Sequence, residues 1–247
     1  MALDNPHSVA QSGSQLMAIT RRTLFGGAAA LGAAGIAVPS SATAAEPLAP
    51  ELLNQLWTSY YSGTRVWGYT DKHSVRPGQS FSLMLSVAPG AKQRHGTIQI
   101  FRIGAHGGAD RKLAAEFPHT DIGSEPFRIT SSVMGLCWPL GIDTIDTTGW
   151  ASGYYSIDFI DDEDGNRDQN VAYIVVRPPD GPLDVLVGLS TNTYQAYNAW
   201  GGTSLYESPY KGDWGHMVSF DRPTPPDFFE NEYFFVAWLE RLAAEHG

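Results

Sequence analysis

The residues best suited to chemistry lie in one segment, from Thr191 to Gly202. Phenols, amides and a Gly-Gly pair crowd together there, and Tyr194 and Tyr197 stand three positions apart. Phenol oxygens can bind metal ions or form hydrogen bonds, and glycine allows close backbone approach to a ligand. The alternative is an aromatic-rich packing loop. Residue types alone favour this plainer interpretation, because buried tyrosine and tryptophan are common in protein cores.

Other polar residues are weaker candidates for chemistry. The side chains that could bind a substrate or fix the loop are Asn192, Asn198, Asp221 and Arg222. For the adjacent Asp221 and Arg222 we favour a structural ion pair. Three acidic residues near the C-terminus, Glu230, Glu232 and Glu240, are interpreted as surface charges.

The remaining titratable residues show no pattern typical of a site. The histidines share no ligand spacing, so each is expected in a loop or at the surface: His73, His95, His106, His119 and His216. The acidic run from Asp161 to Asp168 lacks the calcium-loop pattern and is expected to be a solvated turn. Cys137 has no evident base partner, so we expect a buried structural thiol.

The N-terminus has the three-part order of an export signal. Arg21 and Arg22 precede an uncharged, Gly/Ala-rich run from Gly26 to Val38, and Ala42 and Ala44 form an A-x-A cleavage site. The run is shorter than the roughly 20 apolar residues that span a bilayer, so no stable membrane anchor is expected. We predict a twin-arginine signal peptide over 1–44 and a periplasmic or extracellular protein. Export of an already folded chain mildly favours a protein that carries a metal or cofactor.

The charge of the chain excludes some partners. The formal net charge is −10, and it becomes −11 without Asp4, Arg21 and Arg22 of the predicted signal. Because there is no basic cluster, we expect neither nucleic acid nor an anionic membrane as a partner. With one cysteine the chain can form no internal disulfide, so packing must stabilise the fold.

Residues 67–178 are expected to form a β-sandwich, preceded by a helix or linker over 45–66. Ser80–Val87, Thr97–Ile103 and Gly153–Ile160 alternate polar and apolar residues, which predicts strands with one buried and one wet face. Asn170–Val176 follows the acidic turn, so it should form a hairpin with the preceding strand. Short strands at such spacing favour an antiparallel, immunoglobulin-like sandwich.

A second domain is predicted to begin after the proline-rich segment 177–182, which cannot continue a central strand. The apolar run 183–189 is typical of a strand buried on both faces of an α/β sheet, and polar residues after such a strand often form sites. Phe228–His246 is predicted to be a helix with Phe234, Phe235, Trp238, Leu239 and Leu242 along one side. Since one strand and one helix cannot bury a parallel sheet, 183–247 is expected to be an incomplete α/β domain.

Six motifs, in order from about residue 57 to the end, resemble those of the N,N-dimethylformamidase large-subunit family. The first is Gly68–Gly78, and the second is Phe101–Gly104 with Gly107 and Gly108. The others are Val175–Pro178, then Asn192–Asn198 with Gly201-Gly202 and Ser204–Tyr206, then Val218–Pro223 and Trp238–Glu240. Because the motifs occur in the family's order, they raise the functional interpretation above simple packing.

The resemblance implies a β-sandwich leading into a glutamine-amidotransferase-like α/β domain. It also implies hydrolysis of the C–N bond of small amides by a mononuclear iron that two tyrosinates and a glutamate hold. Phenolate and carboxylate are hard ligands that suit ferric iron, which acts as a Lewis acid. Tyr194 or Tyr197 matches the position of the first tyrosinate, and the sequence does not decide between them.

This chain departs from the family pattern at two points. Thr224 stands where the family commonly has a tyrosine after its Arg-Pro, and no His-x-Glu-Tyr-Trp motif for the glutamate ligand is present. We therefore expect little or no amide hydrolysis by this chain alone. Two alternatives stay open: a non-catalytic exported binding module, and one part of a split gene whose second chain completes the α/β domain.

Overall fold

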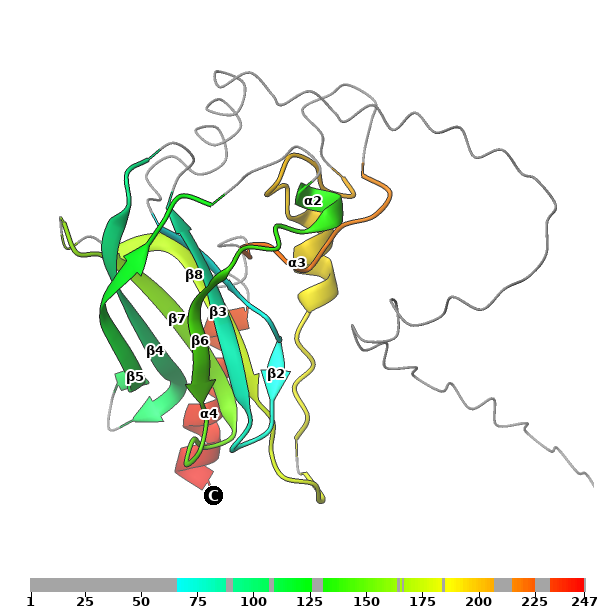
Figure 1. Cartoon of the computed structure of the whole chain (residues 1–247). Coiled ribbons are helices and arrows are strands. Elements are labelled where there is room, and N and C mark those ends of the chain that lie inside the picture. The colour runs from blue at the N-terminus through cyan, green and yellow to red at the C-terminus, as the bar shows by residue number, and fades with distance from the viewer. Residues whose placement is uncertain are drawn as a thin grey trace, which may run out of the picture. The chain divides into compact units, whose positions relative to one another are not determined.

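The computed structural model describes residues 66–87, 91–106, 109–125, 131–163, 165, 167–183, 185–206, 215–224 and 232–246 (Figure 1). All of them belong to one compact unit, Glu46–Gly247, and the other unit is Met1–Ala45. The predicted signal peptide and the predicted helix or linker lie outside the described residues, except Val66, which begins the first strand. Within the described ranges, no helix has the length and apolar character needed to cross a membrane.

Two β-sheets form the body of the protein. The first has the strand order β1-β3-β6 and the second β2-β8-β7-β4-β5, and β2 and β8 are the parallel pair. The first sheet contains β1 (Val66–Thr70), β3 (Ser80–Val87) and β6 (Leu140–Asp146). The second contains β2 (Ser74–Val75), β4 (Arg94–His106), β5 (Ala109–Ile122), β7 (Gly153–Asp161) and β8 (Arg167–Val176).

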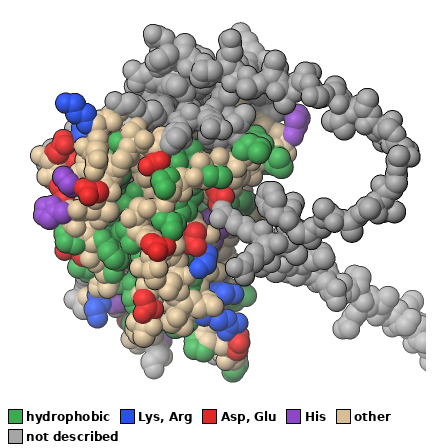
Figure 2. Space-filling model, in the orientation of Figure 1, with side chains coloured by type: hydrophobic (Ala, Val, Ile, Leu, Met, Phe, Trp, Pro, Cys, Tyr) green, Lys and Arg blue, Asp and Glu red, His purple; other side chains and the backbone are tan. Residues whose placement is uncertain are grey.

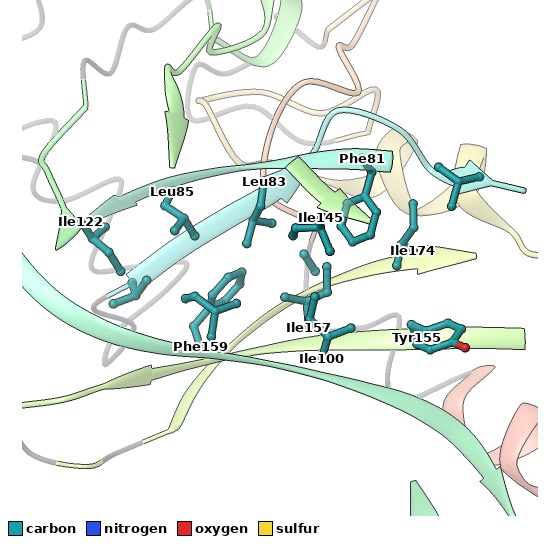
Figure 3. Close-up of a cluster of buried hydrophobic side chains, with 14 of the residues drawn as sticks. Phe81, Leu83, Leu85, Ile100, Ile122, Ile145, Tyr155, Ile157, Phe159 and Ile174 are labelled. Carbon is teal, nitrogen blue, oxygen red and sulfur yellow. The ribbon is translucent and has the colours of Figure 1, made fainter. Parts of the chain in front are cut away.

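The core lies between the two sheets (Figure 3). Alternate residues of β3, Phe81, Leu83 and Leu85, meet Ile157 and Phe159 of β7, as period-two side-chain alternation requires. Glycine is needed at position 68 in β1, since a Cβ there would collide with the ring of Phe159. The sheets therefore approach too closely for any larger residue at that position.

The predicted sandwich is confirmed, with β3 at the predicted bounds and β7 and β8 paired as a hairpin. The immunoglobulin-like and amidotransferase-like assignments stay predictions, as does the division at 177–182. The expectation of one wet face is wrong for β3, where Met84 and Ser86 are buried, and for β7. The second face of β7 is not wet, because Tyr154, Ser156 and Asp158 are all buried. Asp158 is paired there with Arg111, at 2.7 Å between oxygen and nitrogen.

Three helices are described: α2 (Ser131–Met134), α3 (Thr191–Tyr197) and α4 (Phe234–His246). The first part of the predicted terminal helix, 228–231, lies outside the described residues. α4 packs on β4 with Val236 and Ala237 inward, while Phe234, Phe235 and Trp238 are exposed. The structure leaves these aromatic residues of the predicted apolar side at the surface, because the sheet takes the small residues for close contact.

The apolar run 183–189 also differs from its prediction. Its described residues form no strand, and the side chain of Leu186 is 83% exposed. An apolar run becomes a buried strand only when neighbouring strands pair with it. Leu189 alone in this run packs against a described core cluster.

Candidate functional site

The segment after α3 is fixed to the first sheet by an aromatic cluster. Trp200 lies 5.9 Å from Trp67 of β1 and 5.6 Å from Trp138, measured between ring centroids. Tyr69 continues the cluster at 5.5 Å from Trp138. A backbone bond also reaches this segment, since Ser132 N–H of α2 donates to the carbonyl of Gly201 at 3.3 Å. The Thr191–Gly202 segment is thus held firmly against the sandwich.

A buried guanidinium ties the two ends of this segment together. Arg222 is fully buried, and its nitrogens donate to the Gln195 side chain at 3.1 Å and to the carbonyls of Gln195 and Trp200 at 2.8 Å. Asn198, also fully buried, donates to the carbonyl of Pro223 at 2.8 Å and accepts from Trp200 N–H at 3.0 Å. Both side chains hold the loop, which is one of their two predicted roles.

The other candidates of this segment lie apart from one another. Asn192 is exposed, and Asp221 is half-buried with its N–H bonded to Ser219 Oγ. Asp221 acts on His73, because its charge partly opposes the lowering of the His73 pKa that burial causes. Tyr197 is 53% exposed and stacks on Tyr206 at 4.3 Å between centroids. Tyr194, by contrast, is 7% exposed.

Tyr194 belongs to a group of three buried phenols on the outer face of the second sheet. The others are Tyr154 of β7 and Tyr173 of β8, whose rings stack at 5.7 Å. Strand register explains their meeting: Tyr154 pairs with Val175 and Ser156 with Tyr173, so the two tyrosines are diagonal neighbours on one face. Ile103 of β4 and the inner side of α4 complete the surroundings.

A carboxylate, Glu232, is bonded to one of the three phenols and acts on the other two through its charge. The hydroxyl of Tyr194 hydrogen-bonds the Glu232 carboxylate. Oε1 of Glu232 also accepts from Ser190 N–H at 2.9 Å, which fixes the carboxylate at the start of α3. Glu232 Oε2 is buried and has no hydrogen-bond partner within the described part of the chain. The interpretation of Glu232 as a surface charge is therefore wrong.

Burial and mutual repulsion raise the pKa of every phenol in the group. For Tyr154 and Tyr173 desolvation is the largest cause, and negative charge at Glu232 adds to it. The pKa of Tyr194 is raised by desolvation, then by its hydrogen bond and charge interaction with Glu232. The phenols are therefore neutral donors at neutral pH when no cation is bound.

The remaining predicted positions are distributed over the surface and the strands. His95 and His119 are exposed and paired with Asp121 and Asp162, each at 2.9 Å, and His216 is exposed. His106 is half-buried, and its Nε2 is a buried atom. Glu240 is not a free surface charge, because it pairs with Arg102 at 2.9 Å. Glu230 lies outside the described residues.

Two further expectations are corrected. Cys137 is exposed rather than buried; its backbone adopts φ 51°, and the neighbouring Trp138 takes the buried position. The acidic turn is only partly solvated, since Asp161 is buried and its Oδ2 lies 2.8 Å from Arg94. Arg94 also pairs with Glu163 at 2.6 Å. The guanidinium of Arg94 thus pairs with both carboxylates, Asp161 and Glu163.

Sequence reasoning missed Tyr154, Tyr173 and Glu232. The strands contained a signal. Tyr154 occupies one of the alternate positions that were expected to face solvent, and Tyr173 lies between the core residues Ala172 and Ile174. Large aromatic residues at both the odd and the even positions of a strand indicate that both of its faces are covered. Nothing in the local pattern singles out Glu232, since only the packing of α4 brings it to the phenols.

Fold and site define a β-sandwich that carries a buried phenol–carboxylate group on its outer face. The sequence model of the family described as N,N-dimethylformamidase beta subunit-like, C-terminal, matches residues 97–246. Because this match spans more than half of the chain, the chain belongs to that family.

Comparisons with individual proteins add little to this assignment. No curated protein matches the chain. Among solved structures, the superoxide reductase (neelaredoxin) from Ignicoccus hospitalis is similar with 15% identity and a TM-score of 0.27. It covers 52% of this chain and 92% of its own. At that level of similarity we draw no conclusion from it.

Proposed function

We propose that this chain is an exported, iron-binding member of its family, related to hydrolysis of the C–N bond of small amides. The proposed metal ligands are Tyr173, Tyr194 and Glu232. The observation that carries the proposal is the buried Oε2 of Glu232, which lacks a hydrogen-bond partner in the described structure and belongs to a carboxylate bonded to Tyr194. A buried acceptor left in this way costs about 1–3 kcal/mol, which a bound cation would offset.

The donor chemistry fits a hard, highly charged ion. In the part of the chain that the structure describes, no three His, Cys, Asp or Glu side chains form a metal-binding group. The other donors that we propose beside Glu232 are the phenols of Tyr173 and Tyr194. Oxygen donors of this kind favour ferric iron over the softer ions that prefer thiolate or imidazole.

The chain's own residues perform the binding and exclude solvent. Ser190 N–H orients the carboxylate, and the stacked Tyr154 and Tyr173 rings keep the site dry. Phenol protons must leave when a metal binds, so uptake should increase with pH. A ferric ion held there would supply Lewis-acid polarisation of an amide carbonyl and a lowered pKa for water.

We expect little or no turnover of a small formamide by the chain alone. The sequence contains no His-x-Glu-Tyr-Trp motif, and a carboxylate supplied from a different element does not place the reacting water equally well. The family description refers to a beta subunit. A second chain, from a separate gene or a split one, is therefore the partner that we propose for a complete α/β domain.

The test is the metal content and visible absorption of the purified full chain after incubation with ferric iron. We expect about one iron per chain and the intense colour of tyrosinate bound to ferric iron. Tyr194→Phe and Glu232→Gln should each abolish the colour, whereas the exposed Tyr197→Phe should retain it. A colourless, iron-free parent protein contradicts the proposal, as does equal loss in Tyr194→Phe and Tyr197→Phe.

A non-catalytic exported binding module is the second candidate. It is favoured by the exposed, stacked pair of Tyr197 and Tyr206, because surface aromatic rings commonly contact ligands. This alternative predicts a folded protein that stays free of iron under the same incubation. The metal measurement therefore separates the two candidates.

A further inference from the structure

Two of the six motifs that resemble the family meet in the structure. Arg102 belongs to the second motif and Glu240 to the last, 138 positions further along the chain. One guanidinium nitrogen of Arg102 donates to both carboxylate oxygens of Glu240, at 3.1 Å to Oε1 and 2.9 Å to Oε2. Because Arg102 stands in β4 and Glu240 in α4, this contact fastens the helix to the second sheet (Figure 1).

Glycines at two positions leave room for this ion pair. At Gly104 a Cβ atom would lie 3.2 Å from the Cβ of Glu240 and 3.0 Å from a guanidinium nitrogen of Arg102. At Gly153 of β7 a Cβ atom would lie 2.9 Å from Nε of Arg102. The carbonyl of Ser152 accepts two further bonds from the guanidinium, at 2.8 and 3.1 Å. The backbone therefore approaches the pair more closely than residues with side chains would allow.

This pair is less exposed than an ordinary surface ion pair. Acidic and basic side chains are scattered over the face shown in Figure 2, where salt in solution screens them. The side chains of Arg102 and Glu240 are only 19% and 29% exposed, so their attraction is screened less. Arg241 of α4 pairs with Asp110 at 2.6 Å, but both side chains are 52% exposed, and such a pair contributes little.

The apolar contact beneath α4 is small. Of its 13 residues, Val236 and Ala237 are the buried ones. The larger side chains lie on the other side of the helix, where Phe234 is 69% and Trp238 is 53% exposed. A helix of this length is marginal in water without packing, since isolated helices shorter than about 12–15 residues rarely persist. Few buried apolar contacts are typical of elements that open without global unfolding.

The helix lies over the candidate site. Its two buried residues pack in the same cluster as the three phenols. Just before α4, Glu232 and Tyr233 form a wider, π-helical turn, which is a rare conformation found often at functional sites. The Glu232 carboxylate accepts from Ser190 N–H, so this turn is tied to the start of α3 rather than to the helix that follows it.

We propose that α4 is a lid over the phenol–carboxylate group, which opens while the sandwich stays folded, and that the Arg102–Glu240 pair keeps it closed. The turn at Glu232 and Tyr233 is the hinge, because hinges are a few residues at the end of an element. The closed lid keeps water from the phenols, and the open lid gives an ion or a small substrate access to them. Only this access rests on the proposed function, since the opening itself requires no iron.

Thiol labelling measures the opening directly. In a Cys137→Ser background, Ala237→Cys places a thiol beneath α4 and Ala172→Cys places one between the sheets, at positions that are 4% and 2% exposed. An uncharged thiol reagent should modify Ala237→Cys at least about tenfold faster, because only the helix has to open. Val236→Cys is a second probe beneath the lid and should agree. Equal rates beneath the lid and between the sheets would mean that α4 opens only by global unfolding, which overturns the proposal.

Glu240→Gln tests the role of the ion pair. It keeps the shape of the side chain but removes the charge that faces Arg102. We expect labelling of Ala237→Cys to become about tenfold faster, because a hydrogen bond to a charged group is lost, and labelling of Ala172→Cys to stay the same. Asp110→Asn breaks the exposed pair of the same helix, and as the matched control it should change labelling less than about twofold. Equal acceleration of both thiols by Glu240→Gln would show a general loss of stability and would contradict the proposal.

Hydrogen exchange gives an independent answer on the unaltered chain. Backbone amides of α4 should exchange at least about tenfold faster than those of the central strand β7. Equal protection of the two elements would overturn the lid.

Iron uptake separates the lid from the metal site. Glu240→Gln should take up ferric iron faster than the parent and reach the same final amount. If the parent binds no iron but its thiols and amides report the opening of α4, the metal site is refuted and the lid is supported.

Discussion

At the scale of single residues, the phenol group explains where this chain departs from an ordinary sandwich. An ordinary strand at the surface exposes the side chains that point away from the core. Tyr154 and Tyr173 point that way, yet both are buried. Tyrosine tolerates such a position when its hydroxyl finds a polar neighbour, and the Glu232 carboxylate lies within electrostatic reach. Burial of three phenols and one carboxylate together is costly without a cation.

The raised phenol pKa values predict a pH-dependent stability in the metal-free protein. A tyrosine with an unfolded pKa near 10 and a higher folded pKa stays protonated in the fold while the unfolded chain loses its proton. The unfolded state then binds fewer protons, so the free energy of unfolding decreases as the pH rises above about 10. Each such phenol contributes a slope of about 1.4 kcal/mol per pH unit.

Urea unfolding between pH 9 and pH 11.5 measures this slope. We expect Tyr154→Phe to reduce the slope by about 1.4 kcal/mol per pH unit, because one shifted phenol is removed. The parent protein, measured in the same series of buffers, is the reference for this comparison. An identical slope in the parent protein and Tyr154→Phe would mean that Tyr154 is accessible to solvent in the fold.

At the scale of elements, the local sequence pattern predicts the position of a strand or helix better than it predicts what packs against it. Alternation in Ser80–Val87 predicts β3 with its observed bounds, because one face of that strand meets the core. The run 183–189 has an equally clear pattern, but its described residues form no strand, since pairing depends on neighbours that a local pattern does not contain. For α4 the sequence predicts the helix but not the buried side, which is chosen by the fit of Val236 and Ala237 to the sheet.

The candidate site was predictable only in part for the same reason. Tyr194 stands in a conspicuous run of phenols and amides, and its burial distinguishes it from Tyr197. Its neighbours come from β7, β8 and the residues just before α4, which are far apart in sequence. Only the register of the β7–β8 hairpin and the docking of α4 bring Tyr173 and Glu232 to it.

The segment from α3 to Pro223 should depend strongly on the buried Arg222. Its guanidinium satisfies the Gln195 and Trp200 carbonyls, which would remain buried and unpaired without it. We expect Arg222→Met to lower the free energy of unfolding by about 2–6 kcal/mol, at about 1–3 kcal/mol for each of the two unpaired carbonyls. Urea denaturation of the metal-free protein measures this loss.

Arg76→Met is the matched comparison for that experiment. Arg76 pairs with Asp180 at 2.8 Å, and both of these side chains are exposed, in contrast to the buried Arg222. An exposed ion pair contributes about 0–1 kcal/mol, so this variant should be nearly as stable as the parent. If Arg222→Met were equally mild, water rather than the guanidinium would satisfy the two carbonyls.

At the scale of the whole molecule, the proposed site and the predicted route of export are consistent. The phenol group is enclosed by β7, β8, α3 and α4, so it exists only in the folded chain. A metal bound there would have to be acquired as folding finishes. Transport of the folded protein is compatible with this order, whereas transport of an unfolded chain would postpone metal binding until after export.

Export is therefore testable through both processing and metal content. In a bacterium with an active twin-arginine pathway, we expect N-terminal sequencing of the exported protein to begin at Ala45. Substitution of both arginines, Arg21→Lys with Arg22→Lys, should retain the chain in the cytoplasm at its full length. Arg65→Lys with Arg76→Lys is the control for loss of two arginines and should leave export intact.

Recovery of full-length protein in the cytoplasm for all variants, the parent included, would refute the predicted signal. If cleaved protein carries iron only when the chain has its own arginine pair, metal binding depends on export of the already folded protein.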